Sequence, residues 1–156
     1  MMWREVLRVI VPGQPVPKAR PRCQCVDQKP RMYKDKKTRE YENFVATCVS
    51  MSRAYRGKER PLCTDSGPVR VEIKAVFQRP QNMMAKRYPD GLILHTKKPD
   101  IDNITKIVLD GINQLKGLVW GDDSQVCSTD PIKYYTEKTG QPYLEIALFV
   151  PGEGEE

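Results

Sequence analysis

The chain of 156 residues has the size of one ordinary domain and is long enough to bury a hydrophobic core. Lysine and arginine number 26 against 20 acidic residues, which gives a net charge of +6 and a pI near 9.1. The sequence has no apolar run of about 18 residues, which excludes a membrane-spanning helix, and its N-terminus lacks the apolar core of a signal peptide. We therefore expect a cytoplasmic protein whose five cysteines stay reduced.

The cysteines do not predict a metal centre. Cys23 and Cys25 are too close in sequence for a zinc knuckle, and no second cysteine pair follows them. His95 is the single histidine, so we expect no structural zinc. Cys48 and Cys127 are expected to be small core residues.

The N-terminal half begins with a strand over residues 3–11, rich in valine, leucine and isoleucine. Residues 12–31 contain five prolines and predict an extended, irregular arm, because proline fixes φ and removes a hydrogen-bond donor. A helix is expected over 36–53, with a buried side made of Tyr41, Phe44, Val45 and Cys48.

Positive charge gathers in this arm and at the start of the helix. The stretch from Lys18 to Arg39 holds nine basic and two acidic residues. Lys18, Arg20 and Arg22 alternate along the extended part, so we expect them to lie along a DNA phosphate backbone. Charge alone fits a polyanion-binding protein and a generic basic protein equally well.

The C-terminal half alternates strands with one helix. Residues 68–78 show the clearest strand pattern, and a basic connection over 79–98 is long enough to be functional or mobile. After the helix that follows Pro99, further strands are expected over 118–120, 124–136 and 143–150. The order of elements predicts one α+β domain with a mixed β-sheet and two main helices.

The helix after Pro99 has two different faces at about 100° per residue. One face is apolar and is expected to be core: Ile101, Ile104, Val108, Ile112 and Leu115. The opposite face is polar: Asp102, Asn103, Lys106, Asp110 and Asn113. Asp100 stands at the expected N-cap, where its oxygen can accept from free backbone N–H groups.

Each acidic residue also has an ordinary structural interpretation. Asp100 can be a simple N-cap, Asp102 and Lys106 an i,i+4 ion pair, and Asp110 part of a solvated face. Asp122 and Asp123 can form a turn between strands. If the helix packs on the sheet, however, the helix start and this turn converge, and an acidic cluster in a basic protein suits magnesium-dependent cutting of nucleic acid.

Three motifs make the pattern more specific: Asp-x-Asp-Asn-x-x-Lys at 100–106, Leu-Asp-Gly-Ile-Asn at 109–113 and Val-Trp-x-Asp-Asp-Ser-Gln-Val at 119–126. Together they resemble the RusA family of Holliday-junction resolvases. The run Val-Pro-Gly-Gln-Pro-Val-Pro-Lys-Ala-Arg-Pro-Arg at 11–22 also resembles the N-terminal half of phage and bacterial members.

The resemblance implies a RusA-like endonuclease domain over residues 1–150, followed by an acidic tail over 151–156. It implies a bacterial or phage homodimer that binds four-way DNA junctions and cuts two strands symmetrically with one or two Mg²⁺ ions. Matched position by position, Asp100, Asp102 and Asp123 correspond to the metal-binding aspartates and Lys106 to the catalytic lysine, with Asp122 as second choice.

Two other functions stay open. The protein could bind junctions without cutting them, in which case the carboxylates only cap and pair. It could instead be a magnesium-dependent phosphatase or nucleotide hydrolase, although the sequence has no glycine-rich phosphate cradle.

Overall fold

A mixed five-stranded β-sheet forms the centre of the fold in the computed structural model, which describes residues 2–20, 22–52, 55–56 and 59–152. The strand order is β1–β7–β4–β6–β5. Strands β4 and β6 run parallel, and the other neighbours are antiparallel. The strands are Trp3–Pro12 (β1), Val69–Phe77 (β4), Ile93–Leu94 (β5), Val126–Tyr135 (β6) and Tyr143–Pro151 (β7).

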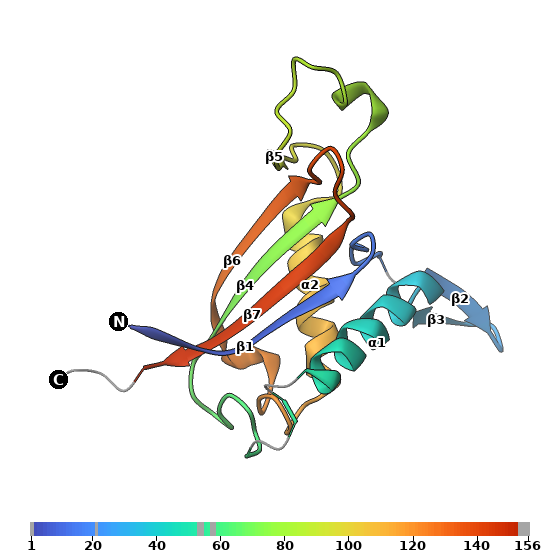
Figure 1. Cartoon of the computed structure of the whole chain (residues 1–156). Helices are drawn as coiled ribbons and strands as arrows, with labels where there is room; N and C mark the ends of the chain where they lie inside the picture. The colour runs from blue at the N-terminus through green and yellow to red at the C-terminus, as the bar shows by residue number, and fades with distance from the viewer. Residues whose placement is uncertain (1, 21, 53–54, 57–58, 153–156) are drawn as a thin grey trace.

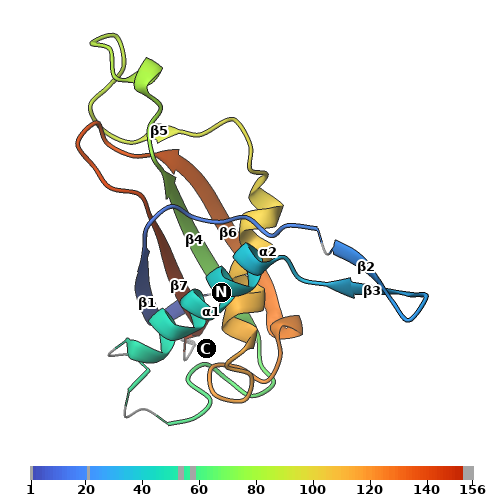
Figure 2. The same ribbon diagram turned by 90° about the vertical axis from the view of Figure 1, so that its right-hand side faces the viewer.

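Two helices, α1 (Lys36–Met51) and α2 (Ile101–Asn113), cover one face of this sheet (Figures 1 and 2). Helix α2 lies in the crossover that joins the parallel strands β4 and β6, which a short turn could not connect. The core lies between the helices and the sheet. The expected α+β fold with a mixed sheet and two main helices is confirmed.

The helices approach each other closely at Gly111. A Cβ atom at this position would lie 3.0 Å from Val45 Cβ and 3.1 Å from the carbonyl oxygen of Glu42. A side chain at this position would press against α1, so glycine lets the two helices lie this close. The glycine of the Leu-Asp-Gly-Ile-Asn motif therefore sets the distance between the two helices.

The other face of the sheet carries no helix (Figure 1) and is polar. Arg8 pairs with Glu5 at 2.6 Å and with Glu145 at 3.2 Å. Lys74 lies over the ring of Tyr134, with 5.8 Å from its Nζ to the ring centroid. Arg8 and Lys74 of this open face therefore have partners within the sheet.

The proline-rich arm contains an element that its composition does not predict. Strands β2 (Arg22–Val26) and β3 (Lys29–Tyr33) form a separate two-stranded sheet, so the expectation of an irregular arm is wrong for its second half. The two turn residues, Asp27 and Gln28, have φ values of 51° and 62°. Positive φ at both positions matches the twist of a hairpin, but Asp-Gln lacks the glycine that usually marks such a turn.

Three expectations about the helices and strands need correction. Helix α1 ends at Met51, and Arg53, its expected last residue, lies outside the described residues. Phe44, expected on the buried side of this helix, is 40% exposed. The strand expected over 118–120 is reduced to one isolated bridge between Thr64 and Trp120, because this short segment meets a loop instead of a neighbouring strand.

The two cysteines expected in the core differ. Cys48 is partly buried and packs against the core, whereas Cys127 is exposed, so the expectation for Cys127 is wrong. Side chains alternate between the two faces of a strand, and on β6 the neighbouring Val126 takes the core side. Most of the acidic tail expected over 151–156 falls outside the described residues.

Arg79 holds the long connection over 79–98 together and attaches it to the end of β6. Arg79 is buried, and its guanidinium donates hydrogen bonds to the carbonyl oxygens of Met83, Pro89, Gly91 and Thr136 at 2.6–3.1 Å. The connection also contains the 3₁₀ helix η1 (Gln81–Met83) and strand β5. Within the described part of the chain, no helix has the length and apolar character needed to cross a membrane.

Candidate active site

Helix α2 presents its polar side to an open groove. Ile104, Val108 and Ile112 are buried in the core as expected, but Ile101 is 40% exposed and lines the groove. Asp100 occupies the N-cap position as expected, yet its side chain makes no capping hydrogen bond. Its carboxylate is therefore not used to complete the helix.

The groove brings together residues that are far apart in the sequence. Asp102, Lys106 and Asp110 reach it from α2, and Asp123 reaches it from the turn before β6. The rest of the lining is uncharged: Ile101, Thr105, Leu109, Thr129 and Pro131. The convergence expected from the sequence is thus present for Asp102, Lys106 and Asp123.

Asp100 lies just outside this groove. It lines a neighbouring hollow together with Lys97, Lys98 and Lys133, and Asp102 borders both spaces. The ammonium of Lys133 donates to the carbonyl oxygens of Lys97 and Pro99 at 2.6 and 2.7 Å. These contacts fix the segment that leads into α2, and they place cations next to the first two aspartates.

The side chains of Asp102 and Lys106 do not form an ion pair. Within the described residues, neither side chain makes a hydrogen bond or salt bridge, although the i,i+4 spacing would allow one. The ordinary structural interpretation therefore does not account for these two residues. Both remain available to a ligand in the groove.

Asp123 is positioned through its backbone. The side-chain oxygen of Asn113, at the end of α2, accepts hydrogen bonds from Trp120 Nε1 at 2.9 Å and from the backbone N–H of Asp123 at 3.1 Å. Trp120 is fully buried. One amide oxygen therefore joins the end of α2 to the turn that carries Asp123.

The same turn is closed from the other side by Gln125. Its Oε1 accepts from the backbone N–H of Asp122 at 2.8 Å, and its Nε2 donates to the carbonyl oxygens of Thr64 and Gly67. A Cβ atom at Gly121 would lie 2.2 Å from the carbonyl oxygen of Asp65, so no larger residue fits there. The Val-Trp-x-Asp-Asp-Ser-Gln-Val motif thus serves largely to build this turn.

Asp122 and Asp123 have different environments. The pKa of Asp122 is held well below its usual value by a side-chain hydrogen bond with Ser124, by the pairing with Lys116 at 3.0 Å and by the backbone N–H of Ser124. Burial and the nearby carboxylates of Asp122 and Asp110 raise the pKa of Asp123. Asp122 is thus a capping residue, and Asp123 is the carboxylate that faces the groove.

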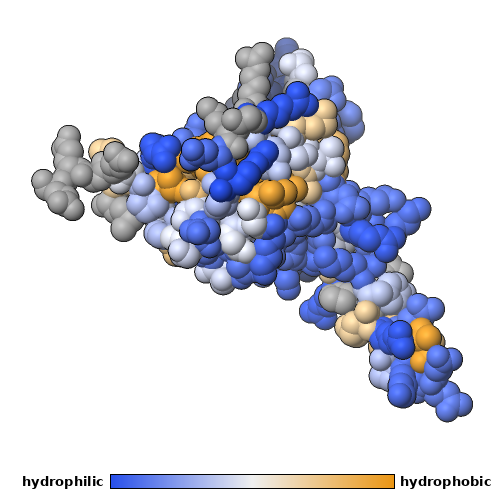
Figure 3. All heavy atoms as spheres, turned by 90° about the horizontal axis from the view of Figure 1, so that it is seen from below, coloured by the Kyte–Doolittle hydropathy of each residue, from blue (hydrophilic) through white to orange (hydrophobic). Residues whose placement is uncertain are grey.

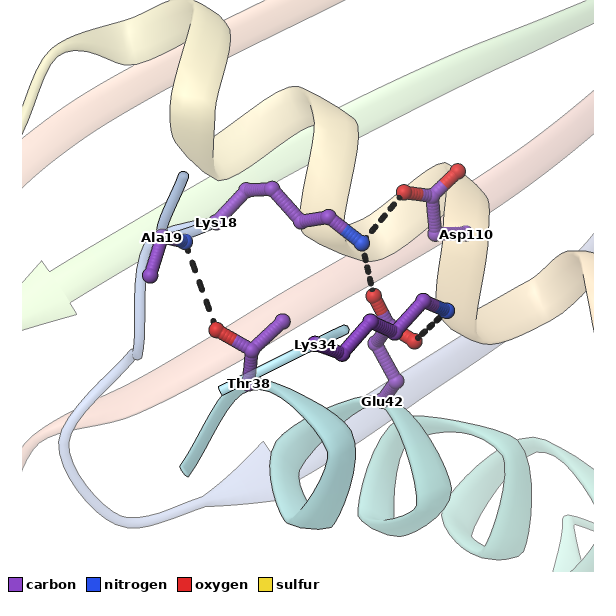
Figure 4. Close-up of polar contacts among 6 residues, drawn as sticks. All are labelled: Lys18, Ala19, Lys34, Thr38, Glu42 and Asp110. Atoms are coloured by element: carbon purple, nitrogen blue, oxygen red, sulfur yellow. Dashed lines mark hydrogen bonds and ion pairs between the residues drawn. The ribbon is translucent and has the colours of Figure 1, made fainter. Parts of the chain in front are cut away.

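Lys18 was expected on the exposed arm, but it lies between the two helices. Its side chain is only 9% exposed and bridges Glu42 of α1 and Asp110 of α2, the latter at 2.8 Å (Figure 4). Burial alone would lower the pKa of Lys18, but the hydrogen bonds to Asp110 and Glu42 outweigh burial and raise it. A lysine so enclosed is not available to a DNA phosphate, which corrects the expectation for this residue.

The two arginines of the arm lie apart from this bridge. Arg20 is exposed, while Arg22 begins β2 and its side chain is outside the described part of the structure. Asp110 and Glu42 were not among the expected site residues. The sequence does carry a signal for Asp110, since it falls on the polar face of α2 with Asp102 and Lys106.

His95 is a packing residue. Its ring stacks on Tyr135 with centroids 4.1 Å apart and meets Phe77 edge-on at 4.9 Å, while its Nδ1 accepts from the backbone N–H of Lys97. Burial and the neighbouring Lys133 lower its pKa. His95 is therefore buried and held by ring packing and one backbone hydrogen bond, and it does not line the groove or the neighbouring hollow.

The donor set suits a magnesium ion bound with part of its water shell. Among the described residues, no three acidic, cysteine or histidine side chains lie close enough to form a ready-made cage. Mg²⁺ usually keeps several waters and takes one or two carboxylates together with substrate phosphates. Asp102 and Asp123 supply two such carboxylates in one groove, so the residues fit this ion.

An acidic groove on a basic α+β domain is the arrangement of a protein that acts on phosphodiester backbones. The family model for endodeoxyribonuclease RusA matches residues 12–148, nearly the whole chain. The chain therefore belongs to the RusA endodeoxyribonuclease family, a family that acts on DNA junctions, and this membership indicates a nuclease. The resemblance expected from the three motifs is confirmed.

A bacterial protein resembles the chain over nearly its full length. It is the uncharacterized protein YqaN of Bacillus subtilis (strain 168), which is 29% identical over 149 residues, 92% of this chain and 96% of the relative. A bacterial relative is consistent with the expected bacterial or phage origin.

Proposed function

We propose that this protein is a magnesium-dependent endonuclease that resolves four-way DNA junctions through paired, symmetric cuts. The supporting observation is the meeting of Asp102, Lys106 and Asp123 in one groove, where Asp102 and Lys106 lack partners within the described chain. Such residues carry no evident structural task. Their chemistry is that of a site for a cation and a phosphate.

The proposed roles follow from position. Asp102 and Asp123 would hold the magnesium ion, and Asp100 in the neighbouring hollow would be available to a second ion. A bound ion would supply polarisation of the phosphoryl group and a water of lowered pKa. Lys106 lies in the same groove and stabilises the negative charge that develops on the phosphate oxygens.

Arg20 is proposed to contact a phosphate outside the groove, because it is exposed in the segment that follows the buried Lys18. Arg22 is proposed to do the same from the start of β2. Such contacts add affinity on every DNA sequence alike and weaken with salt through counterion release.

A homodimer is proposed because a four-way junction has approximate two-fold symmetry, and an isologous pair would bring two identical grooves to opposed strands. Light scattering at micromolar protein should give twice the mass of the 17.9 kDa chain. A monomer with full resolving activity would contradict this part of the proposal.

The decisive experiment is cleavage of a synthetic four-way junction and of a linear duplex with the same arm sequences, each in Mg²⁺ and in EDTA. The proposal expects paired nicks in the junction, only with Mg²⁺, and little cutting of the duplex. Junction binding without cleavage would instead support a binding protein. Equal cleavage of both substrates would support a nuclease without junction selectivity.

A further inference from the structure

The β2–β3 hairpin extends away from the body of the protein (Figures 1 and 2). All five residues of β3 are exposed, and the two strands pair only with each other. Figure 3 shows the projection as a mainly hydrophilic extension. An isolated two-stranded hairpin is at best marginally stable in water, so it contributes little to the stability of the fold.

The strand register gives the hairpin two unlike faces. Residues paired across an antiparallel ladder share a face, and the pairs are Cys23 with Met32, Cys25 with Pro30, Gln24 with Arg31 and Val26 with Lys29. One face therefore carries cysteine, proline and methionine, without charge. The other face carries Lys29 and Arg31, with no carboxylate among its strand residues.

The base of the hairpin is held by one buried carboxylate. Glu42 of α1 is fully buried, and its two oxygens accept from Lys18, which precedes the hairpin, and from Lys34, which follows it, the latter at 2.7 Å (Figure 4). The chain on both sides of the hairpin is thereby attached to the same point of α1.

The same base is attached to the candidate active site. Lys18 also reaches Asp110 in the groove, and its backbone N–H donates to the carbonyl oxygen of Asn103, next to Asp102, at 3.0 Å. The backbone N–H of Ala19 donates to Thr38 Oγ1 at 3.3 Å. These contacts place the root of the hairpin at a defined position relative to the groove.

We propose that the β2–β3 hairpin binds a duplex arm of the DNA junction next to the active-site groove. Lys29 and Arg31 contact phosphates of that duplex arm. This inference rests on the proposed function. A five-residue strand spans roughly 17 Å at about 3.3 Å per residue. A two-stranded ribbon also fits the major groove, which is about 12 Å wide. The charged face of the hairpin is positive, and the whole chain is also basic. The hairpin therefore suits a polyanion better than a second copy of this chain.

The test compares two double variants that remove equal charge. Lys29→Ala with Arg31→Ala alters the hairpin, and Arg8→Ala with Lys74→Ala removes one arginine and one lysine from the open sheet face. Binding to a four-way junction is measured in EDTA over a series of salt concentrations. The hairpin variant should lower the salt slope by about 1.8, that is, about 0.9 for each of two lost phosphate contacts. The control variant should keep the wild-type slope.

The outcomes separate this inference from the proposed function, because wild-type binding and Mg²⁺-dependent cleavage are measured alongside. A wild-type slope in the hairpin variant, with wild-type protein that binds and cuts, overturns the hairpin inference alone. An equal decrease of the salt slope in both double variants also overturns the hairpin inference, since the overall charge of the protein would then explain binding. A hairpin variant that changes only self-association would assign the ribbon to a protein interface. Wild-type protein that does not bind DNA overturns both.

Discussion

The two halves of the candidate active site are built in opposite ways. Around the turn that carries Asp123, Asp122 and Gln125 of the turn and Asn113 at the end of α2 all make side-chain hydrogen bonds that define the backbone. On α2, the groove-facing side chains of Asp102 and Lys106 make none within the described chain. The scaffold uses its polar contacts to position the reactive groups and leaves those groups unpaired.

This difference explains why acidic residues close together in sequence have unlike roles. Asp122 and Asp110 are each paired with a lysine, while Asp102 and Asp123 have no such partner among the described residues. Unpaired carboxylates that share a groove repel each other, and a bound cation would relieve this repulsion. The comparison therefore separates residues that shape the site from residues that act in it.

The largest expected effect comes from Asp102→Asn, which removes a proposed metal ligand without changing the size of the side chain. Cleavage of a four-way junction should fall by more than the roughly 10–100-fold typical for outer-shell partners of a metal. Junction binding in EDTA should be unchanged or tighter, because one repulsive charge is lost. A variant that cuts at the wild-type rate in Mg²⁺ would remove Asp102 from the site.

The next largest effect distinguishes the roles of the adjacent residues Asp122 and Asp123 in cleavage. Asp123→Asn should abolish cleavage, whereas Asp122→Asn should retain most of it. The two changes should shift thermal stability at pH 7 in opposite directions. The pKa of Asp123 is raised in the folded protein, so its ionisation destabilises the fold as the pH rises through that pKa. Asp123→Asn removes this charge and should therefore raise Tm at pH 7.

The lowered pKa of Asp122 means that its charged form stabilises the fold above its ordinary pKa, and this contribution is lost on acidification. Asp122→Asn should therefore lower Tm at pH 7. Thermal melts of both variants at pH 7 check these signs. The assignment of roles fails if Asp122→Asn is the inactive variant.

A smaller effect is expected for Asn113→Ala, which changes only the contacts that hold the turn carrying Asp123. Its amide oxygen accepts from two donors, and a buried donor left unpaired costs about 1–3 kcal/mol. We expect lower stability in urea unfolding and a loss of activity of roughly 10–100-fold, with the Mg²⁺ requirement unchanged. The exposed Asn82 in η1 gives the control Asn82→Ala, which should match wild type.

The smallest expected effect on chemistry is that of Gly111→Ala, which acts on the helix pair that supports α2. The added Cβ would lie 3.0 Å from Val45 Cβ, and overpacking of this kind costs about 1–3 kcal/mol. Gly91→Ala is the matched control, because a Cβ there meets nothing within 4 Å. Equal unfolding free energies for the two variants would show that the helices can separate without cost.

The sequence predicted those parts of the molecule in which local pattern and tertiary structure agree. The alternation in β4 and the two faces of α2 placed the core correctly, apart from Ile101 at the helix start. The role of Lys18 could not be predicted, because it depends on Glu42 and Asp110, which come from two helices distant in sequence. The hairpin was missed because its turn, Asp27-Gln28, lacks the usual glycine.

The most direct test of the site is the position of a divalent ion in crystals grown with Mn²⁺ as a stand-in for Mg²⁺. The account expects an anomalous peak in the groove, at roughly 2.0–2.2 Å from carboxylate oxygens of Asp102 and Asp123, the distance range of a hard cation and its oxygen ligands. The peak should disappear with Asp102→Asn. A peak bound to Asp122, or no peak in the groove at saturating Mn²⁺, would contradict the account.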